Sequence, residues 1–216
     1  MARAVPDTFR DRRDAGRRVG VRLLELGIGP RSVVLGLPRG GVPIAAEAAR
    51  ALDGELDVFV ARKIAHPRRP ELALGALAEG GEPVWDDGLL RRVGLSTADL
   101  ADVVEVERGE IGRRVTSYRG DRALPDVQGR VVVLVDDGVA TGATARAALR
   151  ALRRRKPSRL VLAVPVASPD ALRSLAADAD EAISVLAPDG FGAVGSWYDD
   201  FGQLSDDDVR RALAER

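Results

Sequence analysis

Residues 131–144, VVVLVDDGVATGAT, constrain the fold more than any other part of the chain. Five apolar residues run without polar alternation, as in a strand buried on both faces of a parallel sheet. Ligands of such sheets bind beyond the carboxyl ends of the strands, where Asp136 and Asp137 would lie. An alanine-rich helix follows, and the unpaired N–H groups of its first turn favour an anion. Carboxylates beside an anion site predict that a sugar phosphate binds here.

The composition argues against several other kinds of site. The chain has 216 residues, with 33 basic and 33 acidic side chains, so its overall charge does not draw it to nucleic acid or to a membrane. The absence of cysteine excludes disulfides and thiolate metal sites, and the single His66 argues against a histidine zinc site. No apolar run approaches the roughly 20 residues of a membrane span, and the N-terminus has no apolar signal core. We therefore expect a soluble, cytoplasmic protein.

The order of strand-like and helix-like segments predicts the fold class. Strands alternating with helices favour an α/β fold with a doubly wound, mainly parallel five-stranded sheet flanked by helices. Strands are expected at 33–37, 56–61, 131–135, 160–166 and 182–186, and helices at 9–26, from about 41 to 52, and at 143–155, 170–177 and 206–214. Residues 72–78 and 83–85 are expected to form a hairpin across a glycine-rich turn.

Residues 86–119 exceed an ordinary crossover and predict a helical insertion beside the sheet. The segment is strongly charged, and Ser96 is placed to restart the helix as an N-cap. A solvated helical hairpin is the plain interpretation, and a lid or a homodimer contact is the alternative.

Two further strand ends carry residues suited to phosphate chemistry. In Leu37-Pro38-Arg39-Gly40-Gly41 the glycines permit close backbone approach to a ligand, and the helix that follows favours an anion. A plain strand-to-helix turn is the alternative. Arg62 and Lys63 could neutralise a polyphosphate at the end of the second strand, although a solvated charged loop is the usual explanation of such a pair. Only two of the 33 basic residues are lysines, which favours a function for Lys63.

The loop after the acidic pair, residues 138–144, is named the phosphate loop below. Gly138 and Gly142, with the hydroxyls of Thr141 and Thr144, suit an anion-binding nest. The loop lacks the GK[ST] ending of a nucleotide-binding P-loop and contains no lysine. ATP or GTP hydrolysis is therefore disfavoured.

Residues 131–144 resemble the 5-phosphoribosyl-1-pyrophosphate signature of the type I phosphoribosyltransferases. PRGG at 38–41 resembles that family's pyrophosphate loop, and Arg62-Lys63 matches the basic pair of its adenine-type branch. Residues 188–201 occupy the place of the C-terminal hood. With WYDDF at 197–201, the pattern is most similar to uncharacterised bacterial predicted phosphoribosyltransferases. The resemblance implies one domain, 1–216, with an insertion at about 86–120 and a hood formed by about 188–216 with the N-terminal segment.

The resemblance also implies a role for each matching residue. Asp136 and Asp137 would hold the ribose 2′- and 3′-hydroxyls and, with Lys63, would be the catalytic residues. The 5′-phosphate would lie on the phosphate loop, which consists of Gly138, Val139, Ala140, Thr141, Gly142, Ala143 and Thr144. Arg39, Gly40 and Gly41 would meet the pyrophosphate, in a loop where the family often has a non-proline cis peptide. Lys63, with Arg62 second, would offset the charge of the leaving group. Mg²⁺ is the implied cofactor, held near Asp136 and Asp137 through ligand and water.

The implied reaction is the transfer of phosphoribose to a nitrogenous base with release of pyrophosphate, as in nucleotide salvage. The predicted loop 64–71, the hairpin and the insertion are candidate lids that would exclude water. Two alternatives stay open: a non-catalytic module that senses a phosphoribosyl compound or a nucleotide, and a hydrolase in which water replaces the base.

The acceptor is the open part of this interpretation. Ala140 stands where hypoxanthine/guanine-type members place an aspartate that faces the purine, so a 6-oxopurine is disfavoured. Trp197 and Tyr198 either stack on a base or plug the hood. Glu71, Glu79 and Asp199 are the candidate acid or base groups.

Overall fold

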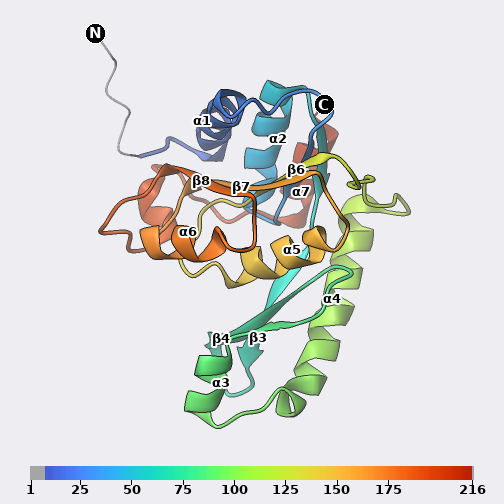
Figure 1. Cartoon of the computed structure of the whole chain (residues 1–216), viewed down its shortest axis with the longest axis vertical. Coiled ribbons are helices and arrows are strands. Elements are labelled where there is room, and N and C mark those ends of the chain that lie inside the picture. Colours follow the sequence, from blue (N-terminus) through green and yellow to red (C-terminus); the bar gives the residue numbers. More distant parts are fainter. Residues whose placement is uncertain (1–7, 216) are drawn as a thin grey trace.

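The computed structural model describes residues 8–215 and places a five-stranded parallel sheet at the centre of the chain (Figure 1). The strands are β1 (Val33–Gly36), β2 (Glu55–Val58), β6 (Val131–Val135), β7 (Arg159–Val166) and β8 (Glu181–Leu186), in the order β2-β1-β6-β7-β8. Helices α1 (Arg12–Glu25) and α2 (Gly41–Leu52) cover one face, and α5 (Ala143–Arg153) and α6 (Pro169–Leu175) cover the other. The predicted doubly wound α/β fold is confirmed.

Strand β6 shows why its sequence lacks polar alternation. Successive residues of a strand point to opposite faces of the sheet. Val132 and Leu134 belong to the core beneath α5, and Val133 and Val135 belong to the core beneath α1 and α2. All four side chains are fully buried, and each burial stabilises the fold by roughly 1.5–3 kcal/mol.

A second sheet begins after β2, near the predicted end of the second strand. Of this sheet, only the hairpin of residues 72–78 and 83–85 was predicted. Strand β2 stops at Val58, and β3 (Ala61–His66) starts a three-stranded antiparallel sheet with β4 (Arg69–Ala78) and β5 (Val84–Trp85). The predicted strand 56–61 is confirmed for residues 56–58, but its predicted end is wrong, and so is the predicted loop 64–71. The loop prediction failed because the buried Ile64 and the pairing of Lys63 with Ala76 extend the hairpin to a tight turn.

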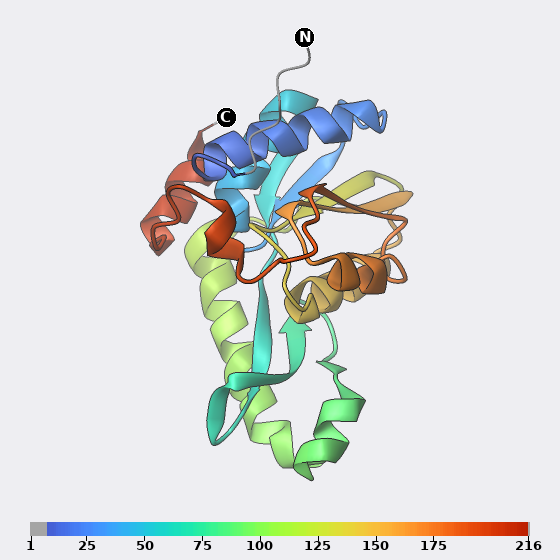
Figure 2. The same ribbon diagram turned by 90° about the vertical axis from the view of Figure 1, so that its left-hand side faces the viewer.

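The predicted insertion contains α3 (Asp87–Val93), a short 3₁₀ helix (Ala98–Leu100) and α4 (Ala101–Arg119). The helical structure restarts next to Ser96, and the Asp99 N–H donates to the Ser96 hydroxyl at 3.4 Å, but the N-cap residue is Thr97 rather than Ser96. One face of α4 is buried against the second sheet through Val104 and Ile111, so the helix is not a solvated hairpin. Together the second sheet and the insertion form a projection, residues 61–119, that we call the arm (Figures 1 and 2).

The glycine- and aromatic-rich residues 188–203, which we call the hood loop, pair with the start of the described chain. The Phe9 N–H donates to the Trp197 carbonyl at 2.8 Å, and the Asp199 N–H donates to the Phe9 carbonyl at 2.8 Å. Helix α7 (Asp206–Ala214) then closes the described chain. The part of the predicted hood before residue 8, and residue 216, lie outside the described residues. Within residues 8–215, no helix is both long and apolar enough to cross a membrane.

Candidate functional site

Two loops meet at the carboxyl ends of the neighbouring strands β1 and β6. Gly36 pairs with Val135 at the ends of these strands, and the Leu37 N–H donates to the Val135 carbonyl at 2.8 Å. The peptide between Pro38 and Arg39 is cis, as the family resemblance implies. The loop 38–41 therefore lies directly beside the acidic pair that follows β6.

Gly40 and Gly41 are required by the closeness of this contact. A Cβ atom on Gly41 would lie 2.5 Å from the Val135 carbonyl oxygen. A Cβ atom on Gly40 would lie 1.7 Å from Oδ2 of Asp137, which is an outright overlap. The sequence suggested that these glycines let a ligand approach the backbone, but the structure shows that they also let the two loops approach each other.

The phosphate loop lines a small cavity of about 180 Å³. Its other lining residues are Asp136, Ala145 and Val194. Gly142 has φ +79°, a conformation that strongly favours glycine, and α5 begins at the next residue without a side-chain cap. The unpaired N–H groups of that first turn can therefore donate to an anion in the cavity.

The far side of the phosphate loop is held by β7 and the residues that follow it. The Val139 N–H donates to the Val166 carbonyl, and the Ser168 N–H donates to the Val139 carbonyl, both at 2.9 Å. The Ser168 hydroxyl donates to the Ala140 carbonyl at 2.9 Å. The loop thus presents a fixed backbone rather than a flexible one.

The two aspartates, although adjacent in sequence, have different surroundings. Asp136 lines the cavity, and its Oδ1 accepts from the Asp137 N–H at 2.9 Å. Burial, with Asp137 beside it, holds the pKa of Asp136 well above its usual range. Burial also raises the pKa of Asp137, against the opposing effect of Arg12. Asp136 therefore faces the phosphate loop, whereas the carboxylate of Asp137 faces Gly40 and Arg12.

Arg12, in the first turn of α1, is a site residue that the sequence analysis missed. Its Nη2 and Nε atoms donate to Oδ2 of Asp137 at 3.3 and 3.4 Å, and its Nη1 donates to the Gly202 carbonyl at 3.0 Å. The guanidinium carbon lies 4.0 Å from the centroid of the Phe201 ring. Nothing in the local sequence distinguishes this arginine from the other arginines of α1, because its partners lie 125 and 190 residues away.

Tyr198 and Trp197 are anchored within the hood loop. The Tyr198 hydroxyl donates to the Asp137 carbonyl at 2.6 Å, and its buried ring lies between Phe9 and Phe201, at centroid distances of 5.3 and 4.9 Å. The Trp197 indole donates to the Phe191 carbonyl at 2.8 Å. These contacts favour the alternative in which both residues plug the hood over the one in which they stack on a base.

The three predicted basic site residues have different surroundings. They are Arg39, Arg62 and Lys63. Arg62 and Lys63 lie within β3 and not at the end of the second strand, so their predicted placement is wrong, and as neighbouring residues of a strand they point to opposite faces. Arg62 forms ion pairs with Glu107 and Glu110 of α4. Lys63 is exposed and donates to the Pro70 carbonyl at 3.1 Å. Arg39 is partly exposed, and its Nη1 lies 3.9 Å from a carboxylate oxygen of Asp206 in α7.

Lys63 lines the largest cavity described in this part of the molecule, about 700 Å³ between the arm and the phosphate loop. Thr141, Ala143 and Arg146 form one wall of this cavity, and Trp85 and Glu71 belong to the other. The arm therefore brings a lysine and a carboxylate to the side of the phosphate loop.

The candidate acid or base groups lie in different places. Glu79 is buried against Arg119, which also approaches Asp57 at 3.8 Å, and burial raises the pKa of Glu79 to about 7. This cluster ties the base of the arm to β2. Asp199 accepts from the Thr8 hydroxyl at 3.1 Å on the surface. The His66 ring accepts from the Arg68 N–H at 3.0 Å in the turn of the hairpin.

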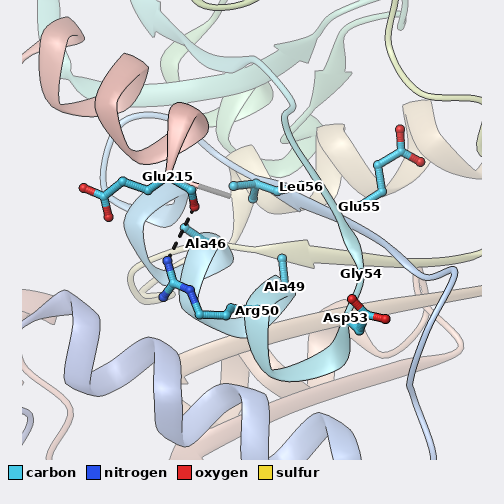
Figure 3. A pocket seen from close by; sticks show the side chains of 8 residues that line it. All are labelled: Ala46, Ala49, Arg50, Asp53, Gly54, Glu55, Leu56 and Glu215. Atoms are coloured by element: carbon cyan, nitrogen blue, oxygen red, sulfur yellow. Dashed lines mark hydrogen bonds between the residues drawn. The ribbon is translucent and has the colours of Figure 1, made fainter.

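A separate cavity of about 260 Å³ lies at the edge strand β2, between α2 and the end of α7 (Figure 3). Arg50 donates there to the Glu215 backbone oxygen at 3.5 Å. None of the predicted site residues lines this cavity.

A metal ion would find few protein ligands at the phosphate loop. Among residues 8–215 there is no group of three or more histidine, cysteine or acidic side chains that could hold one. Asp136 is the one carboxylate among the described residues that line the small cavity. The donor set therefore fits a hard cation that takes most of its oxygen ligands from a bound phosphate compound and water.

The chain is similar to known proteins over most of its length. The model of the phosphoribosyl transferase domain family matches residues 22–194. The Mycobacterium tuberculosis protein Rv0571c, provisionally named a phosphoribosyl transferase, is 45% identical over 201 residues, which cover 93% of this chain and 45% of that protein. The chain thus spans about half the length of the curated relatives it matches.

Solved structures show the same similarity. The crystal structure of the protein TT1426 from Thermus thermophilus has a TM-score of 0.81 and 47% identity, and the match covers 96% of this chain and 98% of that one. A hypothetical protein from Neisseria gonorrhoeae with bound ppGpp has a TM-score of 0.50 and 10% identity over 96% of this chain and 97% of its own. The latter likeness concerns the fold alone.

Proposed function

The chain belongs to the phosphoribosyl transferase domain family, and on this premise we propose that it transfers phosphoribose from 5-phosphoribosyl-1-pyrophosphate to a nitrogenous base. One observation carries the proposal. The phosphate loop, at the N-terminus of α5, lies beside Asp136 and next to the cis-peptide loop 38–41. A sugar with a phosphate at one end and a pyrophosphate at the other would therefore meet hydrogen-bond donors of the protein at both ends.

The donor would bind as follows. Its 5′-phosphate accepts from the N–H groups and threonine hydroxyls of the phosphate loop, and its ribose hydroxyls donate to Asp136, because the carboxylate of Asp137 is held by Arg12. Its pyrophosphate meets Arg39 and the N–H group of Gly40, with Gly41 beside them, since the Gly41 N–H already donates to the Leu37 carbonyl at 2.9 Å. Lys63 offsets the charge of the leaving group from the arm, and Arg62 is second because Glu107 already holds it.

The transfer replaces one bond at the anomeric carbon with another. The C1–O bond to pyrophosphate breaks with an oxocarbenium-like transition state, and the acceptor nitrogen supplies the electron pair for the new C1–N bond. The N–H proton of the base leaves to a nearby carboxylate or to solvent. Mg²⁺ carried by the donor would neutralise charge that develops on the departing pyrophosphate. The backbone donors of the loop 38–41 and Lys63 stabilise the same charge.

The acceptor side favours a base other than a 6-oxopurine. The position that resembles the purine-facing aspartate of the hypoxanthine/guanine type is Ala140, which is exposed and has no side-chain acceptor. Because Trp197 and Tyr198 are anchored within the hood loop, we propose that this loop covers the acceptor and that neither ring stacks on it. The partners that we propose are therefore the phosphoribosyl donor and a small nitrogenous base, in a nucleotide salvage reaction.

The test is pyrophosphate release with the donor, Mg²⁺ and a panel of nitrogenous bases, followed by mass spectrometry of the new nucleotide. We expect release that depends on one class of base. Release without any base would indicate the hydrolase alternative. Donor binding without release under every condition would indicate a sensing module. Neither binding nor release would contradict the proposal.

A further inference from the structure

Arg12 joins three parts of the molecule that are distant in sequence. It lies in the first turn of α1, it donates two N–H groups to the carboxylate of Asp137, and it donates a third to the carbonyl of Gly202 in the hood loop. Its guanidinium also covers the ring of Phe201. Only 11% of the side chain is exposed, so this is a sheltered ion pair rather than a surface one.

Asp137 is held by Gly40 and Tyr198 as well as by Arg12. Gly40 packs against its carboxylate so closely that a Cβ atom would overlap Oδ2. The Tyr198 hydroxyl donates to its carbonyl at 2.6 Å. The carboxylate of Asp137 therefore lies between Gly40 of the loop 38–41 and Arg12.

Arg12 is not needed to attach α1 to the rest of the molecule. Helix α1 packs on α2 through Gly16 and Gly20, where an added Cβ atom would lie 2.7 Å from atoms of α2. Arg13 forms an ion pair with Glu47 of α2 at 2.8 Å. Arg18 covers the ring of Phe9 at 4.3 Å. The contacts of Arg12 with Asp137 and the hood loop therefore call for another explanation.

We infer that Arg12 is a positioning residue of the donor site and acts through Asp137. Arg12 fixes the position of the Asp137 carboxylate, against which Gly40 packs. Through this carboxylate Arg12 links the hood loop to the loop 38–41. Asp136 is then the carboxylate that faces the bound sugar, whereas Asp137 organises the loops around it. The identity of the ligand in this inference rests on the proposed function.

The main test compares Arg12→Gln with a matched control, Arg18→Gln, which removes a guanidinium from an aromatic ring on the same helix. Donor binding in the presence of Mg²⁺ is measured by calorimetry, and stability is measured by thermal unfolding. We expect Arg12→Gln to weaken donor binding by about 10- to 100-fold, since a sheltered charged pair is lost. Arg18→Gln should also lower the melting temperature, because Arg18 covers Phe9 and donates to the Thr8 carbonyl, with donor affinity within about twofold of the wild type.

Two further variants separate positioning from a merely structural role. Arg12→Lys keeps the charge but cannot donate to Asp137 and Gly202 in the same geometry, so we expect it to restore only part of the affinity. The double variant Arg12→Gln with Asp137→Asn should bind the donor no more weakly than the worse single variant, because both changes break one interaction. Additive losses would show that Arg12 does not act through Asp137.

The inference is overturned if Arg12→Gln binds the donor like the wild type, or if its loss of affinity is matched by Arg18→Gln. If the wild-type protein binds no phosphoribosyl donor, the proposed function fails, and hydrogen exchange still tests the positioning. We expect faster amide exchange in residues 39–41 of Arg12→Gln than of Arg18→Gln. Equal exchange in the two variants would refute the positioning role.

Discussion

The phosphate loop and the arm both contribute to the proposed donor site, but they are built in different ways. The phosphate loop and its neighbour, the loop 38–41, end strands of the central sheet and are held by backbone contacts. The arm is held to the same sheet by the buried cluster of Arg119, Glu79 and Asp57 and by the packing of α4. It offers the exposed side chain of Lys63. This contrast suggests that the sheet fixes donor recognition, while the arm adjusts the leaving-group end and the access of water.

A pair of glycine substitutions should give the largest difference between the two regions. Gly40→Ala places a Cβ atom 1.7 Å from Oδ2 of Asp137, so the loop 38–41 must move. We expect this change to destabilise the fold by about 1–3 kcal/mol and to abolish donor binding. Gly109→Ala, on the exposed face of α4 with no atom within 4 Å, should stabilise the fold by about 0.5–1 kcal/mol.

Chemical denaturation and donor calorimetry on both variants would check this pair. If Gly40→Ala binds the donor normally, the contact between the two loops is not important for recognition. If Gly109→Ala also abolishes binding, the arm is more rigidly coupled to the sheet than the contrast above allows.

Substitutions of two neighbouring residues of β3 should distinguish a catalytic role from a structural role within the arm. Lys63→Ala should slow pyrophosphate release by about 100-fold with little change in melting temperature, because the lysine is exposed. Arg62→Ala should lower the melting temperature instead, because it breaks the ion pairs with Glu107 and Glu110. Lys156→Ala serves as the control for removal of a lysine. Equal losses of stability in the Lys63 and Arg62 variants would make Lys63 a structural residue.

The smallest expected effect is a pH dependence of stability that comes from the base of the arm. Burial raises the folded-state pKa of Glu79 to about 7, above its usual value of 4.5. Between these two pH values the folded chain holds a proton at Glu79 that the unfolded chain has lost, so stability falls as pH rises. The free energy of unfolding should therefore increase when pH is lowered from about 8 to about 5.

Denaturation at several pH values, on the wild type and on Glu79→Gln, tests this effect. The Gln variant should lose the part of the dependence that comes from Glu79, whereas the part that comes from Asp136, whose pKa burial also raises, should remain. Its affinity for the donor should not change. A donor affinity that follows the same titration would instead connect Glu79 with the phosphate loop, against the separation of the two regions.

The sequence predicts an element most accurately where the environment of the residues depends on a single strand. The bounds of β6 were predicted to the residue, since burial on both faces leaves an uninterrupted apolar run. The end of β2 was missed, because the residues from Val58 to Ala61 are all apolar and no glycine or proline marks the change of sheet. Arg12 was missed because its role depends on contacts between the two ends of the chain. The unequal surroundings of Asp136 and Asp137 were likewise hidden, because the two residues are identical and adjacent in sequence.

The central claim is that Asp136, together with the phosphate loop, recognises the phosphoribosyl donor. Calorimetry of 5-phosphoribosyl-1-pyrophosphate with Mg²⁺, on the wild type and on Asp136→Asn, tests it most directly. Because burial raises the pKa of Asp136, its neutral replacement should not lower stability at pH 7, so a loss of binding cannot be ascribed to unfolding. We expect the wild type to bind one donor molecule per chain and the variant to bind at least about 100-fold more weakly. Equal affinity in the two proteins would contradict the account.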